Sequence, residues 1–304
     1  MFDNSHGSDA MHDIIKKRNR KNAIITLTVI ILSAIFRVFL TRFYIYPDIH
    51  FYTRAYARFF DYAVAAGIAF LYISSVFLYR YKKDEHTYSA AAACFVQGTQ
   101  TQVFTASVAG FLLAASAVLQ VWSFAANFDQ YANAGIQSNM FDIFIFFAAV
   151  LSSVYFFRTA ALDQDKSAAE TEYSQRYIII SLMPVLWSSL NTFKCFFDMS
   201  RSVNSPVKIY ELMCFVALSL YFVSETRMLA GRLGIAKFFT FAYIAIVITA
   251  LSALPNLILS SFWIMQINDT QIMYAIQLAF TLYIAARIYS QIRYGRFLLQ
   301  GEKY

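Results

Sequence analysis

Long apolar stretches recur along the whole chain and are separated by short polar segments. A helix needs about 20 mostly apolar residues to cross a hydrocarbon core of about 30 Å. Eight stretches meet this requirement, at residues 23–43, 59–79, 103–126, 140–158, 177–197, 208–226, 238–262 and 271–288. The sequence therefore predicts an all-α integral membrane protein with eight transmembrane helices.

The composition supports this class and excludes several others. Hydrophobic residues make up 59% of the chain and charged residues 14%, against roughly 45–50% and about 25% in soluble domains. A soluble globule of this composition would expose large apolar patches and aggregate. Three cysteines provide neither a disulfide framework nor a paired metal-binding motif. Soluble enzymes, disordered chains, collagen-like chains and disulfide scaffolds are excluded.

The first apolar stretch has two interpretations. The basic segment KKRNRK at residues 16–21 followed by AIITLTVIILSAIF is typical of a cleaved signal peptide, but no cleavage motif with small residues follows. Arg37 then interrupts the apolar run. We interpret residues 23–43 as a retained first helix.

Lysine and arginine are unevenly distributed between the two sides of the predicted bundle. With the N-terminus inside, 18 of the 25 fall in inner segments, as the positive-inside rule requires. The net charge of +7 then sets topology, so we expect no nucleic-acid partner and expect inner loops to contact anionic headgroups. This predicts a plasma-membrane protein with both termini cytoplasmic: a basic N-terminal tail (1–22), a transmembrane domain (23–288) and a basic, aromatic C-terminal tail (289–304).

Every second span ends in an apolar or aromatic run that meets an arginine, namely Arg80, Arg158, Arg227 and Arg287. One interpretation is four copies of an ancestral helical hairpin, because internal repeats occur in transporter folds. The other is that stop-transfer arginines recur in any multi-spanning protein, which the irregular spacing favours. In both cases we expect the eight helices to be arranged as four hairpins.

Reactive groups are missing from the predicted spans. All four histidines, His6, His12, His50 and His86, lie in polar segments or loops, which leaves no bis-histidine haem pair and no metalloprotease motif. No phosphate-binding glycine motif occurs either. We therefore predict no catalytic, cofactor-binding or metal-binding residues, no cofactor, and no enzymatic activity.

Polar and charged residues instead gather in the halves of the spans that are predicted to face outward. They are Arg37, Gln120, Asp142, Asn191, Asn256 and Gln277. In one interpretation these side chains line an outward-facing cavity that binds a small polar solute. In the other they tie helices together through interhelical hydrogen bonds of about 0.6–2 kcal/mol each. The sequence leaves both open.

Lys194 and Glu211 form the opposite-charge pair that the sequence brings nearest together. A connection of about ten residues makes the helices at 177–197 and 208–226 antiparallel neighbours. Burial of either charge alone is costly in a membrane. We therefore predict that Lys194 and Glu211 pair near the outer surface.

The segment SLMPVLWSSLNTFKCFFDMS, followed by KIYELMCFVALSLYFVSETRMLAG, contains Pro184, Trp187, Phe193, Glu225 and Arg227. On these residues the chain resembles uncharacterised multi-spanning membrane proteins of Gram-positive bacteria, over about a quarter of its length. The resemblance implies a bacterial plasma-membrane location. It implies no activity and no binding residue.

Three functions fit these observations. The first is binding or transport of a small polar solute through the outer cavity. The second is a membrane sensor or regulatory subunit whose basic inner segments bind a cytoplasmic or membrane protein. The third is a scaffold without a small-molecule substrate.

The predicted topology is tested by cysteine labelling in whole cells, in a variant whose native Cys94, Cys195 and Cys214 are replaced by alanine. A cysteine introduced at Gly135 should react with an impermeant maleimide, because residues 127–139 are predicted to be outside. A cysteine introduced at Lys166 should react only after the cells are lysed. The reverse pattern would contradict the topology.

Overall fold

The structure is a computed structural model, and it is helical throughout the residues that it describes. These are residues 5–45, 58–78, 98–126, 136–162, 175–198, 205–230, 232, 235–261 and 271–294. The helices are α1 (Ser5–Tyr44), α2 (Arg58–Leu78), α4 (Gln100–Ala126), α6 (Ile136–Ala160), α7 (Gln175–Ile180), α8 (Met183–Phe197), α9 (Pro206–Leu229), α10 (Ile235–Ser261) and α11 (Gln271–Tyr294). The all-α prediction is confirmed for the described part of the chain.

Seven helical segments in the described residues are long and apolar enough to cross a membrane. They are Ala23–Tyr44, Gln100–Ala126, Phe141–Ala160, Gln175–Phe197, Pro206–Leu229, Lys237–Ser261 and Gln271–Arg293. Each coincides with a predicted span. The eighth predicted span, 59–79, coincides with α2, which is not among the seven. The structure differs from the predicted N-terminal tail, residues 1–22, because α1 begins at Ser5 and runs without a break into the first span.

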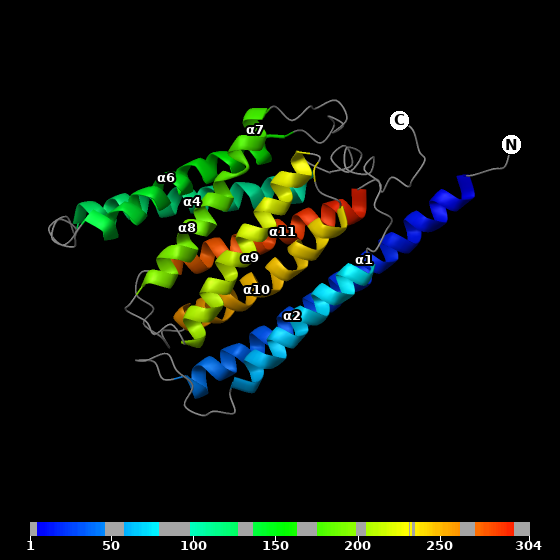
Figure 1. The fold of residues 1–304 in the computed structure, drawn as a ribbon, viewed down its shortest axis with the longest axis horizontal. Coiled ribbons are helices and arrows are strands. Elements are labelled where there is room, and N and C mark those ends of the chain that lie inside the picture. The colour runs from blue at the N-terminus through cyan, green and yellow to red at the C-terminus, as the bar shows by residue number, and fades with distance from the viewer. Residues whose placement is uncertain are drawn as a thin grey trace.

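The helices form an elongated bundle in which α10 is the most buried span (Figure 1). It packs against α1, α2, α9 and α11. Its small residues permit this, since Ala242, Ala245, Ala250 and Ala253 are fully buried and small side chains let helix backbones approach closely. α4 and α6 pack against each other on the opposite side of the bundle, and α11 also contacts α4. The bundle is therefore closed around α9, α10 and α11.

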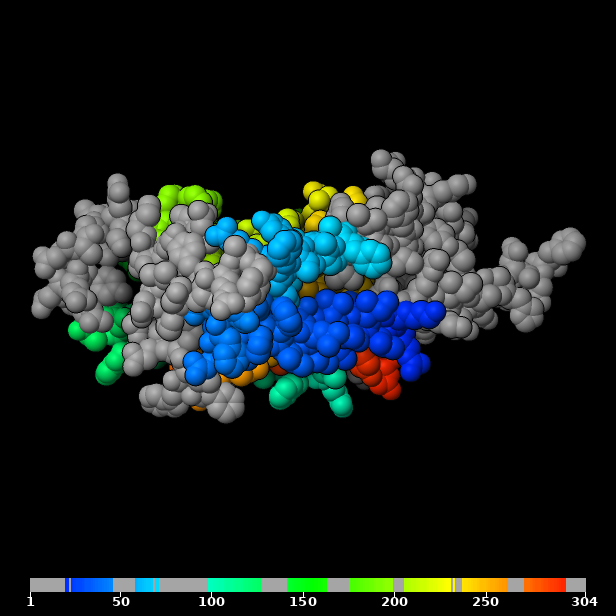
Figure 2. All heavy atoms as spheres, turned by 90° about the horizontal axis from the view of Figure 1, so that it is seen from below, coloured from blue at the N-terminus to red at the C-terminus, as the bar shows by residue number. Residues whose placement is uncertain are grey.

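α1 and α2 lie side by side and cover one face of the bundle (Figure 2). The rings of Phe36 and Phe60 meet between them, with centroids 4.9 Å apart. Large apolar side chains of the outer helices point outward, such as Leu32, Phe59 and Trp122. Hydrocarbon is as apolar as these side chains, so such an exposed surface is stable in a bilayer.

The predicted span 177–197 is broken into two helices, α7 and α8. The break falls at Ser181 and Leu182, just before Pro184 in the first turn of α8. Proline lacks an N–H and its ring clashes with the carbonyl one turn earlier, so a helix tends to break there. The Thr226 hydroxyl of α9 donates a hydrogen bond of 3.1 Å to the Ser181 carbonyl. A neighbouring helix thus satisfies a backbone group released at the break.

Gly110 is the point at which α4 and α6 approach most tightly among the glycines whose surroundings are described. A Cβ atom there would lie 3.1 Å from the Phe157 ring and 3.3 Å from the Phe156 Cβ. At Gly67 of α2 an added Cβ would meet nothing within 4 Å. We expect Gly110→Val to reduce stability by about 1–3 kcal/mol through overpacking, and Gly67→Val to have little effect. Thermal denaturation of the two variants in detergent checks this, and equal losses would contradict the close packing of α4 on α6.

Candidate functional site

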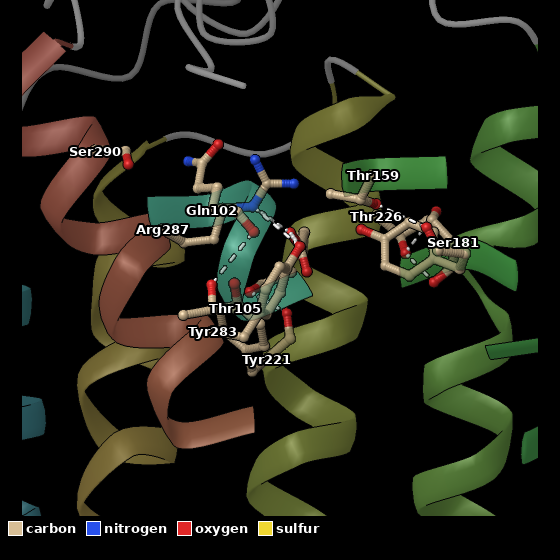
Figure 3. Close-up of polar contacts among 12 residues, drawn as sticks. Gln102, Thr105, Thr159, Ser181, Tyr221, Thr226, Tyr283, Arg287 and Ser290 are labelled. Carbon is tan, nitrogen blue, oxygen red and sulfur yellow. Dashed lines mark hydrogen bonds and ion pairs between the residues drawn. The ribbon is translucent and has the colours of Figure 1, made fainter. Parts of the chain in front are cut away.

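A buried ion pair joins α9 and α11. Arg287 Nε lies 2.9 Å from Glu225 Oε1, and both side chains are 1% exposed. The Tyr283 hydroxyl donates a second hydrogen bond, of 2.7 Å, to the same carboxylate oxygen. Arg287 and Tyr283 project from α11 towards α9 (Figure 3). Since a lone charge in a membrane interior is costly, each ion of this pair compensates the other.

More tyrosines surround the ion pair. Tyr221 lies one turn before Glu225 on α9 and is fully buried. Its hydroxyl is beside the Glu225 carboxylate but outside hydrogen-bonding geometry. Arg287 Nε also donates to the Tyr283 hydroxyl at 3.1 Å. The cluster is therefore a charged centre enclosed by phenol rings.

A second polar cluster links α6, α7 and α9 at the same end of the bundle (Figure 3). The hydroxyls of Thr159 and Tyr177 lie 2.9 Å apart. The Ser181 hydroxyl donates to Thr226 at 3.0 Å. Because Thr226 follows Glu225 directly, this cluster fixes the turn of α9 that carries the buried carboxylate.

Aromatic rings fill the bundle immediately next to the ion pair. We call this group the aromatic layer; its members are Phe156, Trp187, Phe215, Phe222 and Phe280, from α6, α8, α9 and α11. The centroids of Phe156 and Phe280 are 5.4 Å apart, and those of Trp187 and Phe280 are 5.5 Å apart. All five residues are at most 4% exposed. The layer separates the Glu225 centre from the other half of the bundle.

A second buried carboxylate, Glu211, lies beyond the aromatic layer. It is 7% exposed and accepts a hydrogen bond from the Tyr274 hydroxyl of α11. Its other oxygen is 3.9 Å from the Cys195 sulfur of α8. The arrangement repeats that at Glu225: a glutamate of α9 meets a tyrosine of α11.

Glu211 and Glu225 lie on nearly the same side of α9. Fourteen residues separate them, which is close to four turns and about 21 Å along the axis. Phe215 and Phe222 occupy the intervening positions in the aromatic layer. Two carboxylates thus lie in the bundle interior, with the aromatic layer between them along α9.

The ion pair of Lys194 differs from the prediction. Its ammonium lies 2.5 Å from Asp142 Oδ1 of α6, whereas the buried Glu211 carboxylate meets Tyr274 and Cys195. The structure therefore corrects the predicted Lys194–Glu211 pair. α8 packs against α6 as well as α9, and Lys194 is on the exposed rim, with 52% of its side chain accessible.

The predicted polar residues divide into two groups. Asn191 and Asn256 are buried, and their amides donate to carbonyls of their own helices, Trp187 at 2.8 Å and Ser252 at 2.8 Å. The Oε1 atoms of Gln120 and Gln277 are buried without a hydrogen-bond partner in the part of the chain that the structure describes. Gln277 lies one turn from Tyr274 on α11 and is 1% exposed.

Arg37 is fully buried on the side of α9 that faces α1. Its guanidinium carbon is 3.5 Å from the centroid of the Tyr210 ring, a cation–π contact. The Tyr210 hydroxyl in turn donates to Asp61 of α2 at 2.9 Å. Arg37 therefore joins α1 to α9, and the Tyr210 hydroxyl extends this link to α2.

Sequence reasoning missed the Glu225–Arg287 centre. It treated Arg287 as one of four similar arginines, but Arg158 and Arg227 are exposed, whereas Arg287 is buried. Arg80 lies outside the described residues. One signal was available: Arg287 lies well inside α11, which continues to Tyr294, and the acidic residue Glu225 lies inside α9, two spans earlier.

No family model, curated protein or solved structure matches this chain. Among the described residues, no group of three or more His, Cys, Asp or Glu side chains could hold a metal ion. The function is therefore inferred from the arrangement of the buried charges.

A double-mutant cycle tests the buried pair. Arg287→Met and Glu225→Leu should each reduce the free energy of unfolding by about 3–5 kcal/mol, because each leaves the other charge buried. The double variant should recover most of this loss, since apolar side chains are compatible with the interior. Thermal denaturation of the purified protein in detergent provides the measurement.

The rim pair is the matched control. Lys194→Met and Asp142→Leu should each change stability by less than about 1 kcal/mol, because exposed ion pairs contribute little. Equal losses at the two pairs, or additive losses for Glu225 and Arg287, would contradict the assignment of the buried ion pair.

Proposed function

We propose that this chain is a multi-pass plasma-membrane protein that binds a small polar solute inside the helix bundle and moves it across the membrane. The observation that carries the proposal is the placement of Glu211 and Glu225 on one side of α9, buried on either side of the aromatic layer. Ionisable residues inside membrane spans commonly mark substrate or proton pathways.

Stability alone gives no reason for these charges. Replacing a buried ion pair by well-packed apolar residues is often neutral or stabilising, and the Glu225–Arg287 pair is surrounded by aromatic rings that would pack against such residues. A binding role explains why the interior of α9 holds two carboxylates. It also accounts for Gln277, whose Oε1 has no hydrogen-bond partner within the described ranges.

The chemistry favours a solute that carries an amine. A carboxylate beside phenol rings attracts a cation through both charge and cation–π contact. Glu211, with Tyr274, provides such a site near the end of the bundle that we infer to be outside. Glu225 and the Arg287 guanidinium form a second site, at another level of the bundle. There a cationic solute competes with Arg287 for the Glu225 carboxylate.

Movement between the two levels requires the aromatic layer to open. The rings of Phe156, Phe222 and Phe280 close the passage between α6, α9 and α11. Transporters commonly alternate access by rocking helices around a fixed central site. We infer that α9 moves relative to α11, since their contacts here are made by long side chains of Glu225, Tyr283 and Arg287.

The proposal includes the finer topology. We place both termini in the cytoplasm, as the distribution of basic residues indicates, and count α2 as an eighth span, so that the helices form four hairpins. The resemblance to Gram-positive proteins supports a bacterial plasma membrane.

A regulatory, sensor or scaffold subunit is the second candidate. The amides of Asn191 and Asn256 favour it, because they donate hydrogen bonds to carbonyls of their own helices. This is the structural role expected of such residues in a protein without a ligand. In this case a membrane or cytoplasmic protein partner would replace the solute.

The experiment uses purified protein and four probes that differ in charge: putrescine, glycine betaine, glutamate and glucose. We expect putrescine or betaine to raise the melting temperature by several degrees and to show counterflow in proteoliposomes. Glu211→Gln and Glu225→Gln should each abolish the shift. Glu170→Gln, in a polar segment between predicted spans, is the matched control and should retain it.

Two results would contradict solute binding. One is the absence of a shift with every probe, together with copurification of a second polypeptide, which would support a regulatory subunit. The other is a shift that persists in both glutamine variants. The melting temperature of each variant without probe, and its gel-filtration profile, separate loss of binding from loss of folding.

A further inference from the structure

A groove runs between α1, α10 and α11, outside the interior that holds Glu225. It has a volume of about 920 Å³. Its walls are almost entirely apolar: Ala23, Leu27 and Ile30 of α1, Tyr243 and Ile246 of α10, and Ala285, Ile288 and Ile292 of α11. Leu27 and Tyr289, which line it, are 58% and 46% exposed, so the groove opens sideways to the surroundings of the bundle. In Figure 2 the last turns of α11, in red, emerge beside the dark blue part of α1.

Two arginines mark one end of this groove. Arg20 lines it three residues before the first span begins at Ala23, and Arg293 lines it at the last residue of the α11 span. In the sequence, Arg20 belongs to the segment KKRNRK at residues 16–21. Arg293 also donates to the Tyr289 hydroxyl. The end of the groove is therefore strongly cationic at the level of the membrane surface.

The length of the groove matches one leaflet. Arg20 and Ile30 both line it, and ten helical residues rise about 15 Å. This is half of a hydrocarbon core of about 30 Å. The groove thus extends from the headgroup level to the middle of the bilayer.

A buried hydroxyl lies between the arginines and the apolar depth. Thr26 lines the groove, is 3% exposed, and its Oγ1 has no hydrogen-bond partner among the described residues. Thr28, on the same helix, donates to the Ile24 carbonyl at 3.0 Å, which is the usual arrangement in a membrane helix. The Thr26 hydroxyl is therefore a buried polar group behind the wall of the groove.

We propose that this groove binds an anionic phospholipid from the leaflet at that end of the bundle. Its phosphate lies between Arg20 and Arg293, because guanidinium groups bind phosphate oxygens through paired hydrogen bonds. The acyl chains follow Leu27 and Ile30 towards the bilayer centre.

Charge selects this occupant over a transmembrane helix of another protein. A helix would place apolar side chains along the walls equally well, but two arginines at the headgroup level require an anionic group. Basic clusters beside membrane spans bind anionic lipids in this way. The site does not depend on solute binding, since it lies on the opposite side of α10 and α11 from the Glu225 carboxylate.

The test compares two lipids that differ only in their headgroups, dioleoyl phosphatidylglycerol and dioleoyl phosphatidylcholine, added to delipidated protein in detergent. We expect phosphatidylglycerol to give bound adducts in native mass spectra and to raise the melting temperature more than phosphatidylcholine does. Inorganic phosphate should have no effect, because it lacks the acyl chains that fill the groove.

Matched variants separate the groove from general surface charge. Arg20→Gln with Arg293→Gln should weaken phosphatidylglycerol binding at least tenfold. Arg158→Gln with Arg227→Gln removes the same charge from exposed positions near the same end of the bundle and should retain binding. Ala285→Phe, which fills the groove and keeps the charges, should also weaken binding.

Several outcomes would overturn the proposal. These are equal binding of the two lipids, equal losses in the two arginine pairs, or unchanged binding in Ala285→Phe protein that keeps its melting temperature. A fourth outcome is that the protein binds no lipid but copurifies with a polypeptide, which is lost in the Ala285→Phe variant. This would assign the groove to a helix of a partner protein.

Discussion

Hydrocarbon offers no hydrogen bonds, and this single constraint shapes the whole chain. Every backbone N–H and C=O within a span must be satisfied by the protein, so each span is a helix. The break between α7 and α8 follows the same rule, because Thr226 supplies a hydrogen bond to the Ser181 carbonyl. Side-chain amides follow the same rule, because those of Asn191 and Asn256 donate hydrogen bonds to carbonyls of their own helices. These polar groups are thus satisfied within the protein, which makes buried polar atoms without a partner among the described residues, such as Gln277 Oε1, informative.

The charges show how strongly the environment determines the energy of an ion pair. Lys194 and Asp142 are partly hydrated at the rim, where water screens their attraction. Glu225 and Arg287 meet inside the bundle, where loss of either partner leaves a charge with almost no solvation. A cation–carboxylate pair is therefore expected to contribute little to stability at the rim and much more in the interior. This contrast makes the Glu225 centre, and the Glu211 site across the aromatic layer, the places where a polar solute would have most effect.

The two buried carboxylates of α9 and the apolar groove lie on opposite sides of α11. On one side of α11, the carboxylates of α9 meet tyrosines of α11. On the other side, Arg20 within α1 and Arg293 in the last turn of α11 flank an apolar groove. A lipid in the groove would contact α11 near Tyr289, within one turn of Arg287.

The sequence by itself determined the all-α class and the location of the seven helices that are long and apolar enough to cross a membrane. Both depend on hydropathy, which is averaged over residues adjacent in the sequence and does not depend on residues far along the chain. Only the tertiary structure decided which charges meet. Lys194 binds Asp142, 52 residues away, rather than the nearer Glu211, and Arg287 turns inward to Glu225 whereas Arg158 and Arg227 remain exposed. The physical reason is that a partner is chosen by the faces that packed helices present to each other. Those faces depend on the rotation of each helix about its axis, which contacts between helices far apart in the sequence fix.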